Sequence, residues 1–206
     1  MSCVNHELKS IFIHVAKCGG SSLSSFDWNQ GSGHDSYSDY ESKILNISDY
    51  FTWSFVRNPW VRAVSAFEDC PEIHDEVPDF KTYINILYKN KSLFQNKKFT
   101  SYGSNHKIPE FPVGRIHFWP SALCLKNKNG DLSIDFIGKL ENLEEDFKSI
   151  CDKLNIKNCN VPHKNQRKGK KLRKNTFYKD LYNDSLINQV GEIYSEDIEL
   201  FNYSFD

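Results

Sequence analysis

The sequence predicts an α/β fold, a three-layer sandwich in which helices cover both faces of a central parallel sheet. Apolar, β-branched segments at 9–15 and 50–56 each lead directly into a helical pattern. A third strand-like segment, 133–139, precedes another amphipathic pattern. This alternation favours parallel pairing, because each helix returns the chain to the end of the sheet where the next strand starts.

The first strand is expected to end in an anion-binding loop. Residues 11–23 read Ile-Phe-Ile-His-Val-Ala-Lys-Cys-Gly-Gly-Ser-Ser-Leu, an apolar run followed by a lysine, two glycines and two hydroxyls. Gly19 and Gly20 allow close backbone approach, and the helix predicted over 20–28 directs its free N–H groups and positive dipole end at the loop. The nucleotide P-loop has its lysine after the glycines, whereas Lys17 precedes them. The alternative is a plain strand-to-helix turn with an exposed lysine.

The second strand leads into a helix predicted over 58–69. Asn58 is a favoured N-cap residue, and Pro59 suits the first helical position. Apolar residues then recur at the spacing of a buried helical stripe: Trp60, Val64 and Phe67. The segment is therefore a second strand-to-helix junction.

Arg57 lies at the carboxyl end of this second strand, which is where open α/β sheets bind ligands. Ser65 comes about two turns into the following helix and can face the same anion. The alternatives are an ordinary surface ion pair for Arg57 and a solvated hydroxyl for Ser65.

Later segments complete the alternation. Apolar spacing predicts a helix at 79–89 and a final helix between 182 and 201. The turn signal Asn129-Gly130 predicts a hairpin or tight connection between strands at 123–126 and 133–139.

The helix after the third strand has a predicted start at Asn142. Asn142 is the expected N-cap, with Glu145 in the capping-box position. Its apolar face is the set Leu143, Phe147, Ile150 and Leu154.

Together the two junctions resemble the sulfotransferases that use 3′-phosphoadenosine-5′-phosphosulfate (PAPS), especially the carbohydrate branch that includes heparan and chondroitin sulfotransferases. Weaker similarity returns at 135–147 and 194–205. The resemblance implies a P-loop-like sulfotransferase fold in which the first loop binds the 5′-phosphosulfate and the second junction binds the 3′-phosphate. The cofactor-binding residues it implies are Lys17, Cys18, Gly19, Gly20, Ser21, Ser22 and Leu23 in the first loop, and Arg57 and Ser65 at the second junction.

The resemblance also implies catalytic roles. Lys17 would stabilise the leaving phosphate, and His34, in a Gly-His segment after the first helix, would be the base that accepts the acceptor proton. His117 is the reserve base. An exposed loop histidine without catalytic function is the alternative for His34.

A basic run at 163–174 contains seven Lys or Arg and no acidic residue. Such runs are usually solvated loops. Arg167 and Lys168 precede Gly169 and look like the Arg-Lys-Gly element that related enzymes place against the 3′-phosphate, so both are expected to bind cofactor. Nucleic-acid binding is the competing use, but the run lacks interleaved aromatics.

Two further positions carry expectations. The family often has glutamine after a proline where this chain has Ser121, so a substrate or cofactor contact is expected to be altered there. A helix terminus beside Cys18 can lower its thiol pKa and make it a nucleophile. The resemblance argues instead for direct sulfo transfer, with Cys18 as a small loop residue.

Composition bounds the class of protein. The chain has 206 residues, 39% of them hydrophobic, and a net charge of −1, which suits one globular domain over 1–206 and favours neither nucleic-acid nor membrane binding. No apolar run is long enough to span a bilayer and the start lacks a signal-peptide pattern, so a cytoplasmic protein is expected. The six scattered cysteines have no metal-ligand spacing, so no metal site and no dense disulfide framework are expected.

The function predicted from these features is PAPS-dependent transfer of a sulfo group to an acceptor hydroxyl. A carbohydrate, a small hydroxylated metabolite and a peptide tyrosine are the acceptors left open. The segment 72–115 lacks the family's blocks and is expected to carry acceptor specificity. Two alternatives remain open: a nucleotide-dependent phosphotransferase, and a non-catalytic protein that binds 3′-phosphonucleotides.

Overall fold

A computed structural model describes residues 3–23, 34–68, 77–94, 116–157, 159 and 178–205. A four-stranded sheet forms its centre, in the order β1–β2–β3–β4. The strands are β1 (Cys3–Asn5), β2 (Ser10–Ile13), β3 (Phe51–Val56) and β4 (Phe136–Lys139). Strands β2, β3 and β4 run parallel, as predicted, with Ile13 opposite Ser54 and Ser54 opposite Ile137. The short β1 pairs with β2 in the antiparallel direction and adds an edge that was not predicted.

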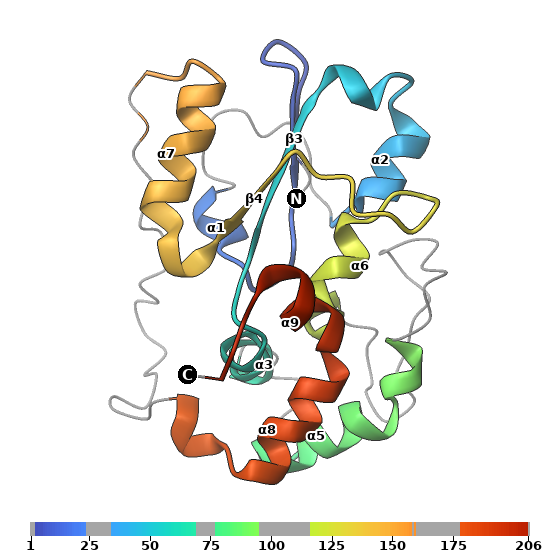
Figure 1. Ribbon diagram of the computed structural model, residues 1–206, viewed down its shortest axis with the longest axis vertical. Coiled ribbons are helices and arrows are strands. Elements are labelled where there is room, and N and C mark those ends of the chain that lie inside the picture. Colours follow the sequence, from blue (N-terminus) through green and yellow to red (C-terminus); the bar gives the residue numbers. More distant parts are fainter. Residues whose placement is uncertain are drawn as a thin grey trace.

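Helices cover both faces of the sheet. Figure 1 shows α7 (Leu143–Lys153) on one side of the strands, and α2 (Tyr37–Lys43) and α6 (Ser121–Leu125) on the other. Trp53 of β3 stacks on Phe12 of β2 with ring centroids 4.4 Å apart, and Phe147 of α7 lies 6.1 Å from Trp53. Because both faces are covered, the β2 side chains are all buried. The predicted three-layer α/β architecture is confirmed.

A group of helices packs beyond the carboxyl ends of the parallel strands (Figure 1). They are α3 (Pro59–Glu68), α5 (Phe80–Lys89), α8 (Asp184–Ile193) and α9 (Ser195–Phe201). The predicted starts of α3 and α5 are confirmed. Asn58 Oδ1 accepts from Trp60 N at 3.1 Å, and Asp79 Oδ1 accepts from Thr82 N at 2.7 Å.

Short helical turns connect these elements. They are α1 (Gly20–Leu23) and the 3₁₀ turns η1 (Ile47–Asp49), η2 (Lys91–Leu93), η3 (Ile116–Phe118), η4 (Leu140–Asn142) and η5 (Tyr178–Leu181). The helix predicted over 20–28 is thus described as far as Leu23.

The single final helix predicted between 182 and 201 is wrong. The chain turns at Tyr194, which ends α8 and precedes α9. Its side chain is buried, and its hydroxyl donates to the Phe118 carbonyl oxygen at 2.7 Å. This tertiary contact holds the break, which apolar spacing does not reveal.

The strand predicted at 123–126 is also wrong, because these residues belong to α6 and the start of the turn after it. The turn itself is confirmed: Gly130 has φ +89°, and its N–H donates to the Asn127 carbonyl at 3.0 Å. One antiparallel bridge, Lys126 with Leu132, flanks this turn. A short apolar run cannot by itself distinguish a buried helix from a strand.

The predicted side-chain cap of α7 is wrong as well. Asn142 is the N-cap by position, but its side chain makes no capping hydrogen bond. The chain enters α7 through η4 rather than from extended backbone, with Asn142 at φ −116° and ψ 32°. Asp146 accepts instead from Lys139 N at 2.6 Å and ties the helix to the end of β4.

A disulfide joins Cys151 near the end of α7 to Cys159, with Cα atoms 6.1 Å apart. Sequence spacing did not point to this pair. Within the described ranges, no helix has the length and apolar character needed to cross a bilayer.

Candidate functional site

Three chain segments meet where the parallel strands end. The β2 loop comprises residues 14–19, the β3 tip comprises Arg57 and Asn58, and the β4 tip is η4. Parallel strands bring their carboxyl ends to one edge of the sheet, and open α/β sheets bind ligands there.

The β2 loop is tightly wound. Lys17 has φ +67° and Gly19 has φ +81°, both in the left-handed region, which costs energy for a lysine. The Cys18 N–H donates to the Val15 carbonyl at 3.4 Å. The loop then opens directly into α1, whose first N–H groups have no carbonyl of their own helix to bind. This geometry suits an anion at the start of α1.

Gly20 is required by close packing. A Cβ at Gly20 would lie 1.7 Å from His14 Nε2, so any side chain here would displace the imidazole. His14 follows β2 and its ring stacks on Phe12 at 5.8 Å. The glycine therefore lets the backbone of α1 lie against this ring.

Two of the predicted loop residues face inward. Burial raises the pKa of the Cys18 thiol to about 12, and its Sγ lies 3.6 Å from the Ala16 carbonyl oxygen. Burial therefore favours the protonated thiol, which argues against the thiolate nucleophile that the sequence left as an alternative. Leu23 is buried in the core, and its N–H donates to the Gly19 carbonyl at 3.2 Å. Both buried side chains therefore support the loop by packing in the core beneath it.

The serines after the glycines start α1. Ser22 is buried, and its N–H donates to the Gly19 carbonyl at 2.9 Å. Ser21 contributes the backbone of the first helical turn.

Arg57 reaches from the β3 tip to the β2 loop. Its Nη1 lies 3.5 Å from the Lys17 carbonyl oxygen, at the long end of the hydrogen-bond range. Burial lowers the pKa of the guanidinium, and the nearby Glu141 carboxylate opposes that shift. Among the described residues this is the one hydrogen bond of the guanidinium, so most of its five N–H donors remain for a ligand.

Ser65 is half-buried on α3. The helical repeat places it on the same side of α3 as Asn58, about 10 Å further along the axis. The other predicted 3′-phosphate contacts, Arg167 and Lys168, lie outside the described residues.

His34 lies against the β2 loop. Its ring stacks on His14 with centroids 4.3 Å apart, and its Nδ1 lies 3.2 Å from the His14 carbonyl oxygen. A carbonyl only accepts, so Nδ1 carries the proton and Nε2 is the basic nitrogen of the neutral ring. Burial lowers the pKa of His34, which keeps the ring neutral at pH 7.

The other candidates lie elsewhere. His117 is half-buried on η3, the turn that precedes Trp119 and α6. Ser121 is fully buried, and its N–H donates to Asp197 Oδ2 at 2.7 Å. Ser121 therefore contacts the protein's own core, not a surface where a substrate or cofactor could bind.

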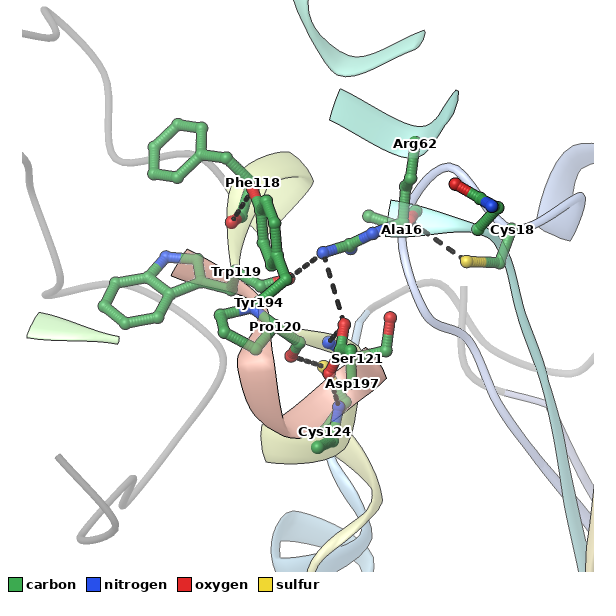
Figure 2. Close-up of polar contacts among 12 residues, drawn as sticks. Ala16, Cys18, Arg62, Phe118, Trp119, Pro120, Ser121, Cys124, Tyr194 and Asp197 are labelled. Atoms are coloured by element: carbon green, nitrogen blue, oxygen red, sulfur yellow. Dashed lines mark hydrogen bonds and ion pairs between the residues drawn. The ribbon is translucent and has the colours of Figure 1, made fainter. Parts of the chain in front are cut away.

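A buried charged network lies beneath the β2 loop, and the sequence did not reveal it. Figure 2 shows the Arg62 guanidinium between the Trp119 carbonyl and the Asp197 carboxylate, with Tyr194 alongside. Nη2 of Arg62 donates to the carbonyl at 2.6 Å and lies 3.8 Å from Asp197 Oδ2. Its guanidinium carbon is 5.1 Å from the centroid of the Tyr194 ring.

Asp197 joins this network to α6. Its second oxygen accepts from Ala122 N at 2.8 Å, so the carboxylate caps the start of the helix. Burial raises the pKa of Asp197, while Arg62 and the two α6 N–H groups oppose that shift. The network fixes α3, α6 and α9 under the loop.

Helix α2 was missed from the sequence. A serine and an aspartate three residues apart could have predicted its start, because Ser36 and Asp39 form a capping box there.

The described residues offer no cluster of three or more His, Cys, Asp or Glu side chains that could hold a metal ion. At the strand tips, the cationic side chains of Lys17 and Arg57 and the backbone N–H groups at the start of α1 are of the kinds that bind anions.

Comparison with known proteins agrees with this geometry. A family model described as the sulfotransferase family matches residues 2–204. Neither the curated proteins nor the solved structures gave a match. The matched residues include all three strand tips. The family match therefore covers the β2 loop with its glycines and the arginine at the end of β3. The chain belongs to the sulfotransferase family.

Proposed function

We propose that the protein transfers a sulfo group from PAPS to an acceptor hydroxyl. The observation that carries this proposal is the 3.5 Å approach of Arg57 Nη1 to the Lys17 carbonyl, because it brings the two predicted anion sites side by side. One nucleotide with phosphates at its 3′ and 5′ positions can then engage both. A nucleotide with a single phosphate group would leave one site without its anion.

The residues present suit such a ligand. The start of α1 and the Lys17 ammonium would hold the 5′-phosphosulfate, and Arg57 with Ser65 would hold the 3′-phosphate. The half-buried Arg57 guanidinium has lost part of its hydration and still has N–H donors to offer. Hydrogen bonds to a doubly charged phosphate would compensate for the water that both groups lose. PAPS, when bound, supplies a sulfo group attached to a phosphate leaving group.

The chain's own groups would then act at three points. Lys17 and the N–H groups of Gly20 and Ser21 stabilise negative charge that grows on the leaving phosphate oxygen. His34 Nε2 accepts the proton of the acceptor hydroxyl, because Nδ1 is committed to the His14 carbonyl. The tight loop holds these groups in a fixed orientation, which lowers the entropic part of the barrier.

The first test is a mass-spectrometric acceptor screen with PAPS. We expect at least one hydroxyl-bearing acceptor, with carbohydrates first in the panel, to gain a sulfo group while adenosine 3′,5′-bisphosphate is released. Lys17→Ala should reduce turnover by about a hundredfold or more and weaken nucleotide binding less, because a leaving-group contact acts mainly in the transition state.

Two results would contradict the proposal. Phosphorylated product from ATP with magnesium would indicate a phosphotransferase. Tight binding of adenosine 3′,5′-bisphosphate without product from any acceptor would indicate a binding protein.

The Lys17→Ala variant tests a separate point, the role of the lysine. Equal losses in turnover and in nucleotide affinity would show that Lys17 only binds the nucleotide.

A further inference from the structure

A short segment after α9, residues 202–205, lies against the β3 and β4 tips. Asn58 Nδ2 donates to the Ser204 carbonyl at 2.7 Å, and Lys139 Nζ lies 3.4 Å from the Asn202 carbonyl. Figure 1 shows the chain descending from α9 past α3 at this point. The 202–205 segment thus contacts the residue that directly follows Arg57.

Phe205 anchors the segment to the helical layer. Its ring lies 5.8 Å from Trp60 on α3 and 5.2 Å from Tyr182, both edge to face. Its carbonyl accepts from the Tyr178 hydroxyl at 3.3 Å. These contacts fix the end of the segment, so its middle residues hold a defined position against the sheet edge.

Glu141 connects the segment to the β3 tip. Its Oε1 accepts from the backbone N–H of Asn58 at 2.8 Å, and its Oε2 accepts from the Tyr203 hydroxyl at 3.0 Å. Lys139 Nζ lies 4.6 Å above the centroid of the Tyr203 ring. One carboxylate therefore joins three elements: the β3 tip, the β4 tip and the 202–205 segment.

We propose that Glu141 and Tyr203 are positioning residues for Arg57, and that the 202–205 segment is thereby part of the nucleotide site. The argument is geometric: the peptide group held by Glu141 links Arg57 to Asn58, so the carboxylate restricts the backbone from which the guanidinium projects. This inference rests on the proposed function, because it assigns a role within the 3′-phosphate site.

The negative charge of Glu141 lets an experiment distinguish a positioning role from a purely electrostatic one. A carboxylate near an anion-binding arginine repels a phosphate, so if Glu141 acted only through its charge, removing it would tighten nucleotide binding. Positioning predicts the opposite sign. Burial raises the pKa of Tyr203, and Glu141 raises it further, so the phenol retains the proton that it donates.

The test measures selectivity for the 3′-phosphate, defined as the Kd of adenosine 5′-monophosphate divided by the Kd of adenosine 3′,5′-bisphosphate. We expect Glu141→Ala to lower this ratio by about tenfold and Tyr203→Phe by roughly threefold, as for loss of charged and weaker hydrogen bonds. Glu141→Gln should fall between the wild type and Glu141→Ala. Affinity for the monophosphate should stay constant, because the β2 loop is untouched.

A matched pair elsewhere supplies the control. The Tyr88 hydroxyl donates to Glu192 Oε2 at 3.0 Å on the exposed surface between α5 and α8. The Tyr203–Glu141 hydrogen bond has the same donor and acceptor types and the same length. Tyr88→Phe and Glu192→Gln should leave selectivity unchanged. Unfolding midpoints of all variants show whether they remain folded.

The outcomes separate the two claims. Unchanged or increased selectivity in folded Glu141→Ala would overturn the positioning role while leaving the proposed function standing. A wild-type ratio near one would contradict the proposed function itself. A fall in the ratio for the Glu141 and Tyr203 variants, with none in the controls, supports the inference.

Discussion

At the residue scale, the most informative side chain is His34, because its environment defines its proton state. Its Nδ1 lies 3.2 Å from the His14 carbonyl oxygen, so Nδ1 carries the proton of the neutral ring and Nε2 is the basic nitrogen. Burial shifts the pKa of His34 downwards from its ordinary value near 6.5. A base with a lowered pKa remains neutral, and therefore active, into mildly acidic solution.

This predicts the acid limb of the pH profile. As pH falls through the folded-state pKa, His34 gains a proton and can no longer accept one, so kcat/KM should fall with an apparent midpoint below about 6.5. His34→Ala should lose turnover by at least about a hundredfold and lose this limb, while nucleotide still binds.

The control for the base is His117→Ala, which should keep both the rate and the acid limb. The opposite pattern, in which His34→Ala keeps near-normal turnover and His117→Ala loses it, would move the base role to η3. Both profiles come from initial rates at saturating and limiting acceptor.

Sequence reasoning at this scale could single out residues whose position follows directly from a strand end. Lys17 and Arg57 could be singled out because each comes after an apolar strand and before a helix start, and the structure brings them together. Arg62 could not, because a charged residue in a helix normally faces solvent. Its partner Asp197 lies in a different helix far along the chain, so no local pattern connects them.

At the element scale, the Arg62–Asp197 pair determines how α3, α6 and α9 pack. Both side chains are almost completely buried, whereas exposed ion pairs contribute little to stability. Removing one partner of a buried pair leaves an uncompensated charge in the core.

We therefore predict strong, non-additive destabilisation. Arg62→Met and Asp197→Asn should each lower the free energy of unfolding by about 3–5 kcal/mol, and the double variant should lose at least about 1 kcal/mol less than the sum. Urea denaturation measures all three. The Lys43–Asp35 pair is the control, because its lysine side chain is 57% exposed and Lys43→Met should cost under about 1 kcal/mol. Additive losses would show that the two side chains do not stabilise each other.

The failures of prediction at this scale share a cause. The run Leu123 to Leu125 is short and apolar, and it belongs to α6, whose first N–H groups, those of Ser121 and Ala122, donate to Asp197. The break at Tyr194 depends on its hydrogen bond to Phe118. In both cases a distant contact overrides the local pattern. The three parallel strands and the starts of α3 and α5 were predictable because apolar spacing and capping residues act locally.

At the scale of the whole molecule, the parallel sheet explains why the site lies where it does. Three strands end at one edge, and each contributes a tip: the β2 loop, Arg57 with Asn58, and η4. The order of strands and helices along the chain predicted this edge. The 202–205 segment that closes it was not predictable, because its role depends on where α9 ends in space.

The central claim is that the two neighbouring anion sites hold one nucleotide with phosphates at both ends. Calorimetric titration of the wild type and Arg57→Ala with adenosine 3′,5′-bisphosphate and adenosine 5′-monophosphate tests it most directly. We predict that the 3′-phosphate strengthens wild-type binding by about 1.5–3 kcal/mol and that Arg57→Ala removes most of this gain. Equal affinities of the wild type for the two nucleotides, or an unchanged gain in Arg57→Ala, would contradict the account.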